Sequence, residues 1–182
     1  MEIFSIYSYA INAAEKLSQF LLSKFSPPPV LLCLGTDRML ADCLGAMVAT
    51  DLRNADYPNY IYGGLAAPIT HQSAQFCHDF IHTMHPTSPL IIIDSMATTE
   101  QARLGHISIN STYVGAINSL DLHANLFIYG ISSLLRNNRL CAARLNNIFS
   151  LNSAISDGIK KFTKNIQKIN KNYPQQICLS KN

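Results

Sequence analysis

The sequence has few charged residues and no long apolar run. Asp, Glu, Lys and Arg together account for 14% of the 182 residues, whereas they make up about a quarter of an average soluble domain. Apolar residues account for 48%, but none of their runs reaches the roughly 18 residues that a membrane-spanning helix requires. We therefore expect one domain with a sizeable core, no membrane partner, and a surface apolar enough to support a homo-oligomer.

Cysteine occurs five times, an odd number, and no two cysteines form a Cys-x-x-Cys pair. This usage argues against a disulfide framework. The chain begins with Met-Glu and shows neither a basic start nor an Ala-x-Ala cleavage site, so a signal peptide is not expected. Both observations predict a cytoplasmic protein with reduced thiols.

Motifs for several common chemistries are also missing. The sequence contains no Gly-x-Ser-x-Gly segment for a serine nucleophile, no P-loop and no Gly-x-Gly-x-x-Gly segment, so nucleotide binding has no support. Positive charge gathers from Leu151 onward, where six Lys accompany one Asp. These lysines alternate with an apolar stripe from Ile155 to Ile169, which indicates an amphipathic helix with a solvated basic face rather than a nucleic-acid partner.

The hydrophobic pattern predicts strands that alternate with helices. The predicted helices cover residues 3–25, 40–53, 70–85, 133–149 and 152–171, and the predicted strands cover 30–35, 57–63, 89–94, 104–109 and 125–131. This order is typical of an α/β fold with a mostly parallel sheet. We expect a helix and Pro-rich linker at 1–29, one α/β domain at 30–172 and a loose tail at 173–182.

Polar side chains occur near the expected ends of these strands. Asp42 follows the first strand, Asp94 directly follows three isoleucines, and Asp121 and His123 precede the last strand. Ligands of open parallel sheets bind beyond the carboxyl ends of the strands, and a carboxylate beside an apolar strand is costly unless it is bonded or paired. Taken singly, each residue also has a structural explanation, such as a capped loop or a helix start.

Six segments within residues 30–160 resemble the YyaC-type spore protease family. They are GTDRMLADCLG at 35–45, YGGLAAPITH at 62–71, IIIDSMA at 91–97, LGHISI at 104–109, LDLHANLFIYGISS at 120–133 and RNNRL at 136–140. The family is similar to the germination protease and to the hydrogenase maturation proteases. The resemblance implies a three-layer α/β/α sandwich of the phosphorylase/hydrolase-like kind.

The resemblance also implies a peptidase that acts on a protein or peptide substrate during sporulation, in the cytoplasm of the sporulating cell or forespore. It places the functional aspartates at Asp42 and Asp94, with His123 as a third position. Four further residues would support the site or bind substrate: Asp37, Arg38, His71 and Asp121.

Two chemistries fit these residues. In the first, Asp42 and Asp94 form a dyad in which one carboxyl keeps its proton, because two close carboxylates do not both ionise easily. In the second, Asp42, Asp94 and His123 hold a divalent metal ion that carries a water molecule.

A non-catalytic protein that binds a partner in the same cleft is a third interpretation. It follows from departures from the family pattern: Ala46 stands where the family has Pro, His71 is shifted by one position, and the Gly-rich segment is reduced to YVGAINS at 113–119.

Two other groups of residues have simpler interpretations. His78, His82 and His85 follow helical spacing, which can create a zinc site, but an incidental surface stripe is favoured because no glutamate lies between them. Cys43 could act as a nucleophile with His123, but a buried thiol at a helix start is favoured.

Overall fold

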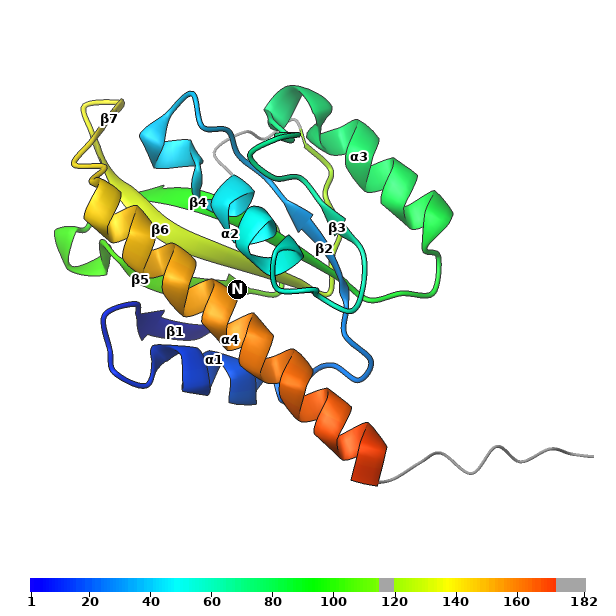
Figure 1. Ribbon diagram of the computed structural model, residues 1–182. Helices are drawn as coiled ribbons and strands as arrows, with labels where there is room; N and C mark the ends of the chain where they lie inside the picture. The colour runs from blue at the N-terminus through cyan, green and yellow to red at the C-terminus, as the bar shows by residue number, and fades with distance from the viewer. Residues whose placement is uncertain (115–119, 173–182) are drawn as a thin grey trace, which may run out of the picture.

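A computed structural model describes residues 1–114 and 120–172 of the protein (Figure 1). The expected tail at 173–182 and the centre of the reduced Gly-rich segment, with Gly115 and Ala116, lie outside the described residues. In chain order the elements are β1 (Glu2–Tyr7), α1 (Ala13–Leu22), β2 (Val30–Cys33), the 3₁₀ turn η1 (Leu40–Asp42), α2 (Leu44–Arg53), β3 (Ile61–Tyr62), α3 (His71–Met84), β4 (Leu90–Thr98), the 3₁₀ turn η2 (Gln101–Arg103), β5 (His106–Asn110), β6 (Leu126–Arg136), β7 (Arg139–Cys141) and α4 (Leu145–Asn172).

The strands of the described part form one mixed sheet in the order β1-β5-β6-β4-β2-β3, with β7 paired to β6. Its centre confirms the predicted α/β alternation, because β3, β2, β4 and β6 are parallel to one another. β5 and β7 are antiparallel to β6, and β1 is antiparallel to β5. The sheet is therefore mostly parallel in direction, with β5 and β7 reversed.

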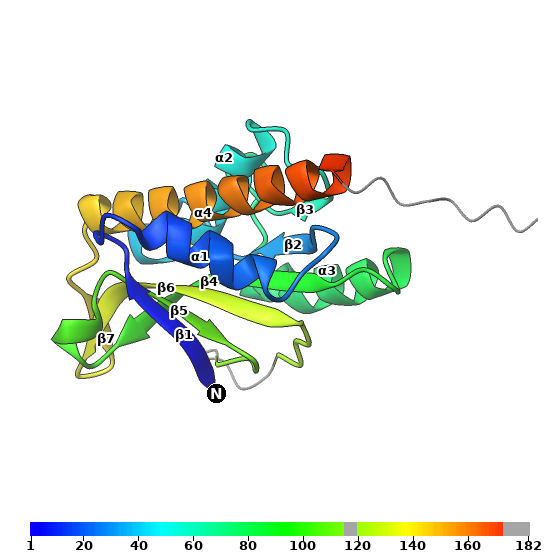
Figure 2. The same ribbon diagram turned by 90° about the horizontal axis from the view of Figure 1, so that it is seen from below.

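Helices cover both faces of the sheet. α1, α2 and α4 lie together on one face, where they pack on side chains such as Leu31 and Ile91 (Figure 2). α3 packs on the other face, which carries Leu32 and Ile92. Successive side chains of a strand point to opposite faces, so a strand covered on both faces must be apolar throughout. This requirement explains the continuous apolar runs of β2 and β4.

The predicted helix over residues 3–25 is wrong in its first half. Residues Glu2–Tyr7 form the edge strand β1, in which Ile6 lies opposite Ile107 of β5, and α1 begins only at Ala13. Ile3, Tyr7 and Ile11 fit one face of a helix, yet all three are exposed in the structure. The β-branched and aromatic residues of this segment suit a strand equally well. The strand is favoured here because it forms backbone hydrogen bonds with the edge of β5.

The predicted helices over 133–149 and 152–171 are also wrong in part. β6 continues to Arg136 and turns back as β7, and α4 is one continuous helix from Leu145. The turn between the strands contains Asn137 and Asn138, which both have positive φ angles. Asn tolerates this conformation better than most residues, and two such residues in succession form the turn preferred in tight hairpins.

α4 is the longest helix of the described part, and its apolar side chains lie on one side only. Ile155, Ile159 and Phe162 are buried against the sheet and α1, whereas Lys161 and Lys164 are exposed. This arrangement confirms the expected amphipathic helix. Across residues 1–114 and 120–172, no helix is at once long enough and apolar enough to cross a lipid bilayer.

The segment from Gly35 to Gly45 follows β2 and lies against Leu34 and against Ile93 of β4. Gly35 has a φ of +135°, and a Cβ atom there would lie 2.1 Å from the carbonyl oxygen of Asp42. A Cβ atom on Gly45 would lie 2.0 Å from the carbonyl oxygen of Leu34 and 2.9 Å from that of Ile93. Both positions thus require glycine, because backbone atoms occupy the space of a side chain.

We expect Gly45→Ala to destabilise the protein by about 3 kcal/mol or more, because the added methyl group meets two backbone oxygens that cannot rotate away. Chemical denaturation of both proteins measures this difference. Gln19→Ala, at an exposed position of α1, is the control and should change the free energy of unfolding by less than about 0.5 kcal/mol. Equal stability of Gly45→Ala and the control would contradict the close approach of α2 to the sheet.

Candidate functional site

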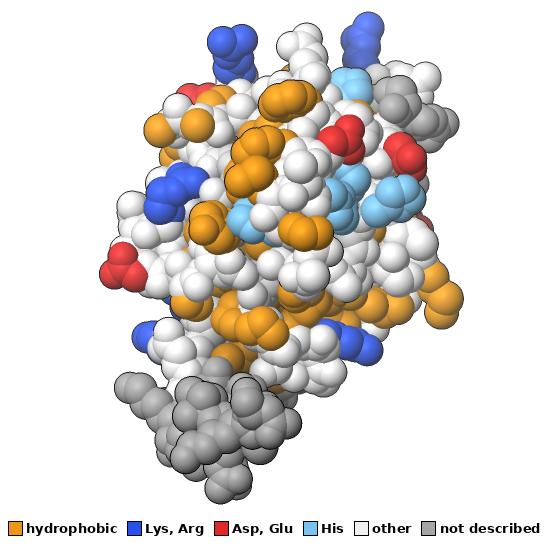
Figure 3. Space-filling view, turned by 90° about the vertical axis from the view of Figure 1, so that its right-hand side faces the viewer, with side chains coloured by type: hydrophobic (Ala, Val, Ile, Leu, Met, Phe, Trp, Pro, Cys, Tyr) orange, Lys and Arg blue, Asp and Glu red, His pale blue; other side chains and the backbone are white. Residues whose placement is uncertain are grey.

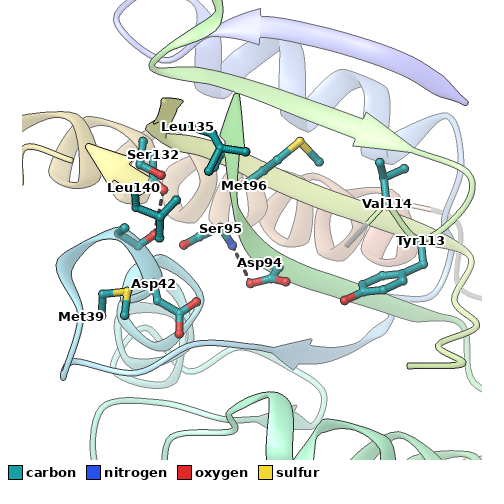
Figure 4. Close-up of a pocket in the computed structure, with 13 residues that line it drawn as sticks. Met39, Asp42, Asp94, Ser95, Met96, Tyr113, Val114, Ser132, Leu135 and Leu140 are labelled. Atoms are coloured by element: carbon teal, nitrogen blue, oxygen red, sulfur yellow. Dashed lines mark hydrogen bonds between the residues drawn. The ribbon is translucent and has the colours of Figure 1, made fainter. Parts of the chain in front are cut away.

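Asp42 and Asp94 line the same pocket, which has a volume of about 480 Å³ (Figure 4). Asp42 comes from η1 and Asp94 from β4. The pocket lies beyond the last residue of β2, where an open parallel sheet commonly binds its ligand. The two residues selected by the sequence are therefore brought together by the fold.

β4 holds Asp94 beside the end of β2. The last pair between the two strands is Cys33 with Ile93, so Asp94 is the first residue of β4 without a partner in β2. Its other neighbour is Tyr129 of β6, and the N–H of Ser95 donates a hydrogen bond of 2.7 Å to its Oδ1. The expected strand end at Asp94 is wrong, since β4 continues to Thr98.

Two hydrogen bonds hold the η1 segment that carries Asp42. The N–H of Thr36 donates to the carbonyl oxygen of Asp42 at 3.0 Å, and the Ser132 hydroxyl donates to the carbonyl oxygen of Ala41 at 2.8 Å. Ser132 is the extra residue of a bulge in β6, because Met96 and Ala97 of β4 lie opposite residues 131 and 133. Bulges redirect a side chain locally, and this one turns a buried hydroxyl toward η1.

The electrostatics of the pocket favour one proton on the pair. Burial raises the pKa of the Asp94 carboxyl to about 8; the Ser95 N–H lowers it and the negative charge of Asp42 raises it further. Burial also raises the pKa of the Asp42 carboxyl, which is less deeply buried. Asp42 lies two residues before the first residue of α2, next to the N-cap residue Cys43, and the N-terminal end of a helix favours negative charge. Near neutral pH, Asp94 therefore keeps its proton and Asp42 is the carboxyl that ionises.

The walls of the pocket are mainly apolar. Met96 and Val114 line it together with Tyr113, whose hydroxyl points toward Asp94 in Figure 4. Burial raises the pKa of Tyr113, and the charge of Asp94 raises it further. The phenol therefore stays neutral and can donate a hydrogen bond inside the pocket.

His123 and Asp121 are not part of this arrangement. Both are exposed on the loop before β6, where Oδ1 of Asp121 lies 3.1 Å from Nε2 of His123, and the described lining of the pocket contains neither. No group of three or more His, Cys, Asp or Glu side chains suited to a metal ion occurs in residues 1–114 and 120–172. The described residues thus do not assemble the expected metal-binding trio of Asp42, Asp94 and His123.

The remaining candidates lie at the edge of the site. Asp37 and Arg38 are exposed in the loop after β2, where the N–H of Arg38 donates to the Thr36 hydroxyl at 3.3 Å. His71 is the exposed first residue of α3. None of the three is among the described residues that line the pocket.

The histidines of α3 do not all lie on the surface. His78 is only 4% exposed: its Nε2 accepts a hydrogen bond of 2.9 Å from the N–H of His123, and its Nδ1 lies 2.9 Å from Oδ1 of Asp79. The predicted incidental surface stripe is wrong for this residue, which attaches the loop before β6 to α3. Figure 3 shows histidines beside hydrophobic side chains on this side of the molecule.

Cys43 is buried at the start of α2, as the sequence predicts. Its thiol donates to the carbonyl oxygen of Leu40 at 3.2 Å, and burial raises its pKa. A thiol with a raised pKa is a poor nucleophile.

Sequence reasoning missed several residues of the pocket. Leu135 and Leu140 fall in the helix predicted over 133–149, and Ser132 falls between the predicted strand and this helix, whereas all three belong to β6 or β7. The signal that could have found them is the Asn-Asn pair, because Asn is a turn residue that tolerates positive φ. One arginine flanks this pair on each side, and apolar residues lie beyond both arginines.

We expect the stability of Asp94→Asn, relative to that of the wild-type protein, to increase as the pH rises. Between pH 4 and pH 8 the unfolded carboxyl has lost its proton while the folded one, with a pKa of about 8, retains it. The unfolded state then binds fewer protons, so wild-type stability falls with pH by at most about 1.4 kcal/mol per unit, and the fall ends above the folded pKa. The amide introduced by Asp94→Asn cannot ionise, so the variant escapes this loss.

Urea unfolding at several pH values measures this effect as the difference in unfolding free energy between variant and wild type. Asp157→Asn, at an exposed position of α4, is the control and should follow the wild-type profile. Parallel profiles for Asp94→Asn and wild type would show that the Asp94 carboxyl ionises normally.

Comparisons with known proteins relate the chain to a family. The model described as "Protein of unknown function (DUF1256)" matches residues 5–158. The chain is also similar to "Uncharacterized protein YyaC" of Bacillus subtilis (strain 168), with 27% identity over 172 residues that span 84% of this chain and 80% of that protein. The resemblance to YyaC seen in the motifs is thereby confirmed. The chain belongs to the DUF1256 family, and the matched span contains both aspartates and the walls of their pocket.

Proposed function

We propose that the protein hydrolyses a peptide bond of a protein or peptide substrate, with Asp94 as the general acid and Asp42 as the general base. The observation that supports this proposal is the shared pocket in which the pKa of Asp94 is raised to about 8 beside the second carboxyl of Asp42. A pair of titratable groups with different environments is the usual arrangement for acid and base roles.

The proposed reaction uses both carboxyls in each half. Asp42 accepts a proton from a water molecule as its oxygen bonds to the peptide carbonyl carbon, and Asp94 gives its proton to the carbonyl oxygen. In the second half Asp42 returns its proton to the peptide nitrogen, the carbon–nitrogen bond breaks, and one hydroxyl of the tetrahedral intermediate gives its proton to Asp94. Both groups are then restored, and the neutral phenol of Tyr113 can stabilise the oxygen of the intermediate.

The resemblance to the spore protease family extends this proposal. On this resemblance we propose that the activity belongs to sporulation, in the cytoplasm of the sporulating cell or forespore, and that the fold is a three-layer sandwich of the phosphorylase/hydrolase-like kind. The helices on both faces of the sheet agree with such a sandwich. We also propose a homo-oligomer, because Phe76, Phe80 and Met84 are exposed along one side of α3.

We expect Asp42→Asn and Asp94→Asn each to lower peptide cleavage about a thousandfold or more, since each variant loses one proton transfer. The assay incubates the full chain with a defined mixture of synthetic peptides in oxygen-18 water, and mass spectrometry detects the label in newly formed carboxyl groups. The wild-type rate should fall on the alkaline side near pH 8, where Asp94 loses its proton, and on the acid side, where Asp42 gains one.

Asp157→Asn should cleave like the wild type. Full cleavage by both pocket variants would exclude the dyad. Peptides bound by the wild type without any hydrolysis would favour the non-catalytic partner-binding interpretation. Loss of cleavage on addition of a chelator, with recovery on addition of a divalent cation, would favour the metal-dependent maturation-type mechanism.

A further inference from the structure

The mouth of the pocket is formed by large apolar side chains that are exposed to solvent. Leu135 and Leu140 of the β6–β7 hairpin are 36% and 49% exposed, and Met39, just before η1, is 52% exposed. All three line the pocket, and Figure 4 shows them together on the side of the pocket that is opposite Tyr113 and Val114. We call these three residues the apolar rim.

The hairpin directs its two leucines to the same side. Leu135 lies directly opposite Leu140 in the antiparallel pairing, and Arg136 lies opposite Arg139. Directly opposed residues share a face of the ribbon, and successive residues alternate between faces. The leucine pair therefore faces the pocket, while the two arginines lie on the other face of the hairpin.

The rim is held in place on both sides. The guanidinium of Arg136 donates a hydrogen bond of 3.2 Å to Oε1 of Gln101, and the Ser132 hydroxyl fixes the η1 segment beside Met39 through Ala41. Exposed large apolar side chains gathered at one place mark a binding surface more often than a free one. Hydrogen bonds of neighbouring residues, rather than burial of the rim side chains themselves, hold the apolar rim in position.

The charge of the pocket determines what can occupy it. Its only ionised lining group in the described part is a carboxylate of the Asp42–Asp94 pair, since no Lys, Arg or His is among the described lining residues. An acidic ligand would meet negative charge without a compensating cation. A peptide group can instead accept a hydrogen bond from the protonated Asp94, and an apolar side chain can be buried against the rim.

We propose that the apolar rim is the substrate-selecting part of the site and binds a polypeptide by one large apolar side chain, of the Leu, Met or Phe class, next to the bond presented to Asp42 and Asp94. The volume of about 480 Å³ is in the range of pockets that enclose a ligand of this size. The cleavage step rests on the proposed function, whereas the binding step does not.

The test uses blocked peptides acetyl-Ala-Ala-X-Ala-Ala-amide, with X as Leu, Met, Phe, Ala or Asp. Isothermal titration calorimetry measures their affinity for the Asp42→Asn protein, in which cleavage does not interfere. We expect peptides with Leu, Met or Phe to bind about tenfold or more tightly than the Ala peptide, because removing methylenes from an apolar contact costs at least this factor. The Asp peptide should bind most weakly.

The double substitution Leu135→Ala/Leu140→Ala should reduce the preference for Leu over Ala to less than about threefold. Both leucines are exposed, so thermal unfolding should show a folded protein. Leu145→Ala is the matched control, since Leu145 is 64% exposed on α4 and is not among the described lining residues. It should keep the full preference.

The two proposals fail in different ways. An apolar preference that depends on the rim, together with no hydrolysis by the wild type, would support the rim and contradict the peptidase. Cleavage that requires both aspartates but is equal for every X would contradict the rim alone. Absence of binding for every peptide, or a preference unchanged by the double substitution, would also overturn the role of the rim.

Discussion

At Gly35 and Gly45 the backbone of the η1–α2 segment touches the backbone just beyond β2 and at Ile93 of β4. The carbonyl oxygens of Asp42 and Leu34 occupy the places where side chains would stand. A methyl group at Gly45 would push α2 away from the sheet. This contact sets the depth at which Asp42 enters the pocket. It also brings Asp42 close enough to Asp94 for its charge to raise the pKa of that carboxyl.

The balance of forces on Asp94 explains how a carboxyl is tolerated beside the core. The hydrogen bond from the Ser95 N–H favours the charged form, but burial outweighs it, so the pKa rises to about 8. A buried carboxyl without a cation becomes neutral rather than remaining charged. A lowered pKa would need a cationic partner or further hydrogen-bond donors to the carboxylate, and the described lining contains no Lys, Arg or His.

The sequence predicted the parts of the fold that depend on local pattern. The central strands and α3 follow from apolar runs and helical spacing, and Asp94 follows from the cost of a carboxylate after three isoleucines. β1 was mistaken for helix because Ile3, Tyr7 and Ile11 fit helical spacing equally well. The β6–β7 hairpin was mistaken for helix because the Asn137–Asn138 turn was not recognised, and Leu135 and Leu140 were missed with it.

The sequence by itself determined the α/β class and the amphipathic helix near the C-terminus, and it selected the two aspartates as candidates, because apolar patterns and short motifs involve residues close together in the chain. Only the tertiary structure decided what surrounds them. Pairing with β5 made the N-terminal segment a strand, the register of β4 with β2 placed Asp94 just beyond the end of β2, and His123 was attached to α3 instead of the pocket. These outcomes depend on contacts between distant segments. A local sequence pattern carries no information on the free energies of such contacts.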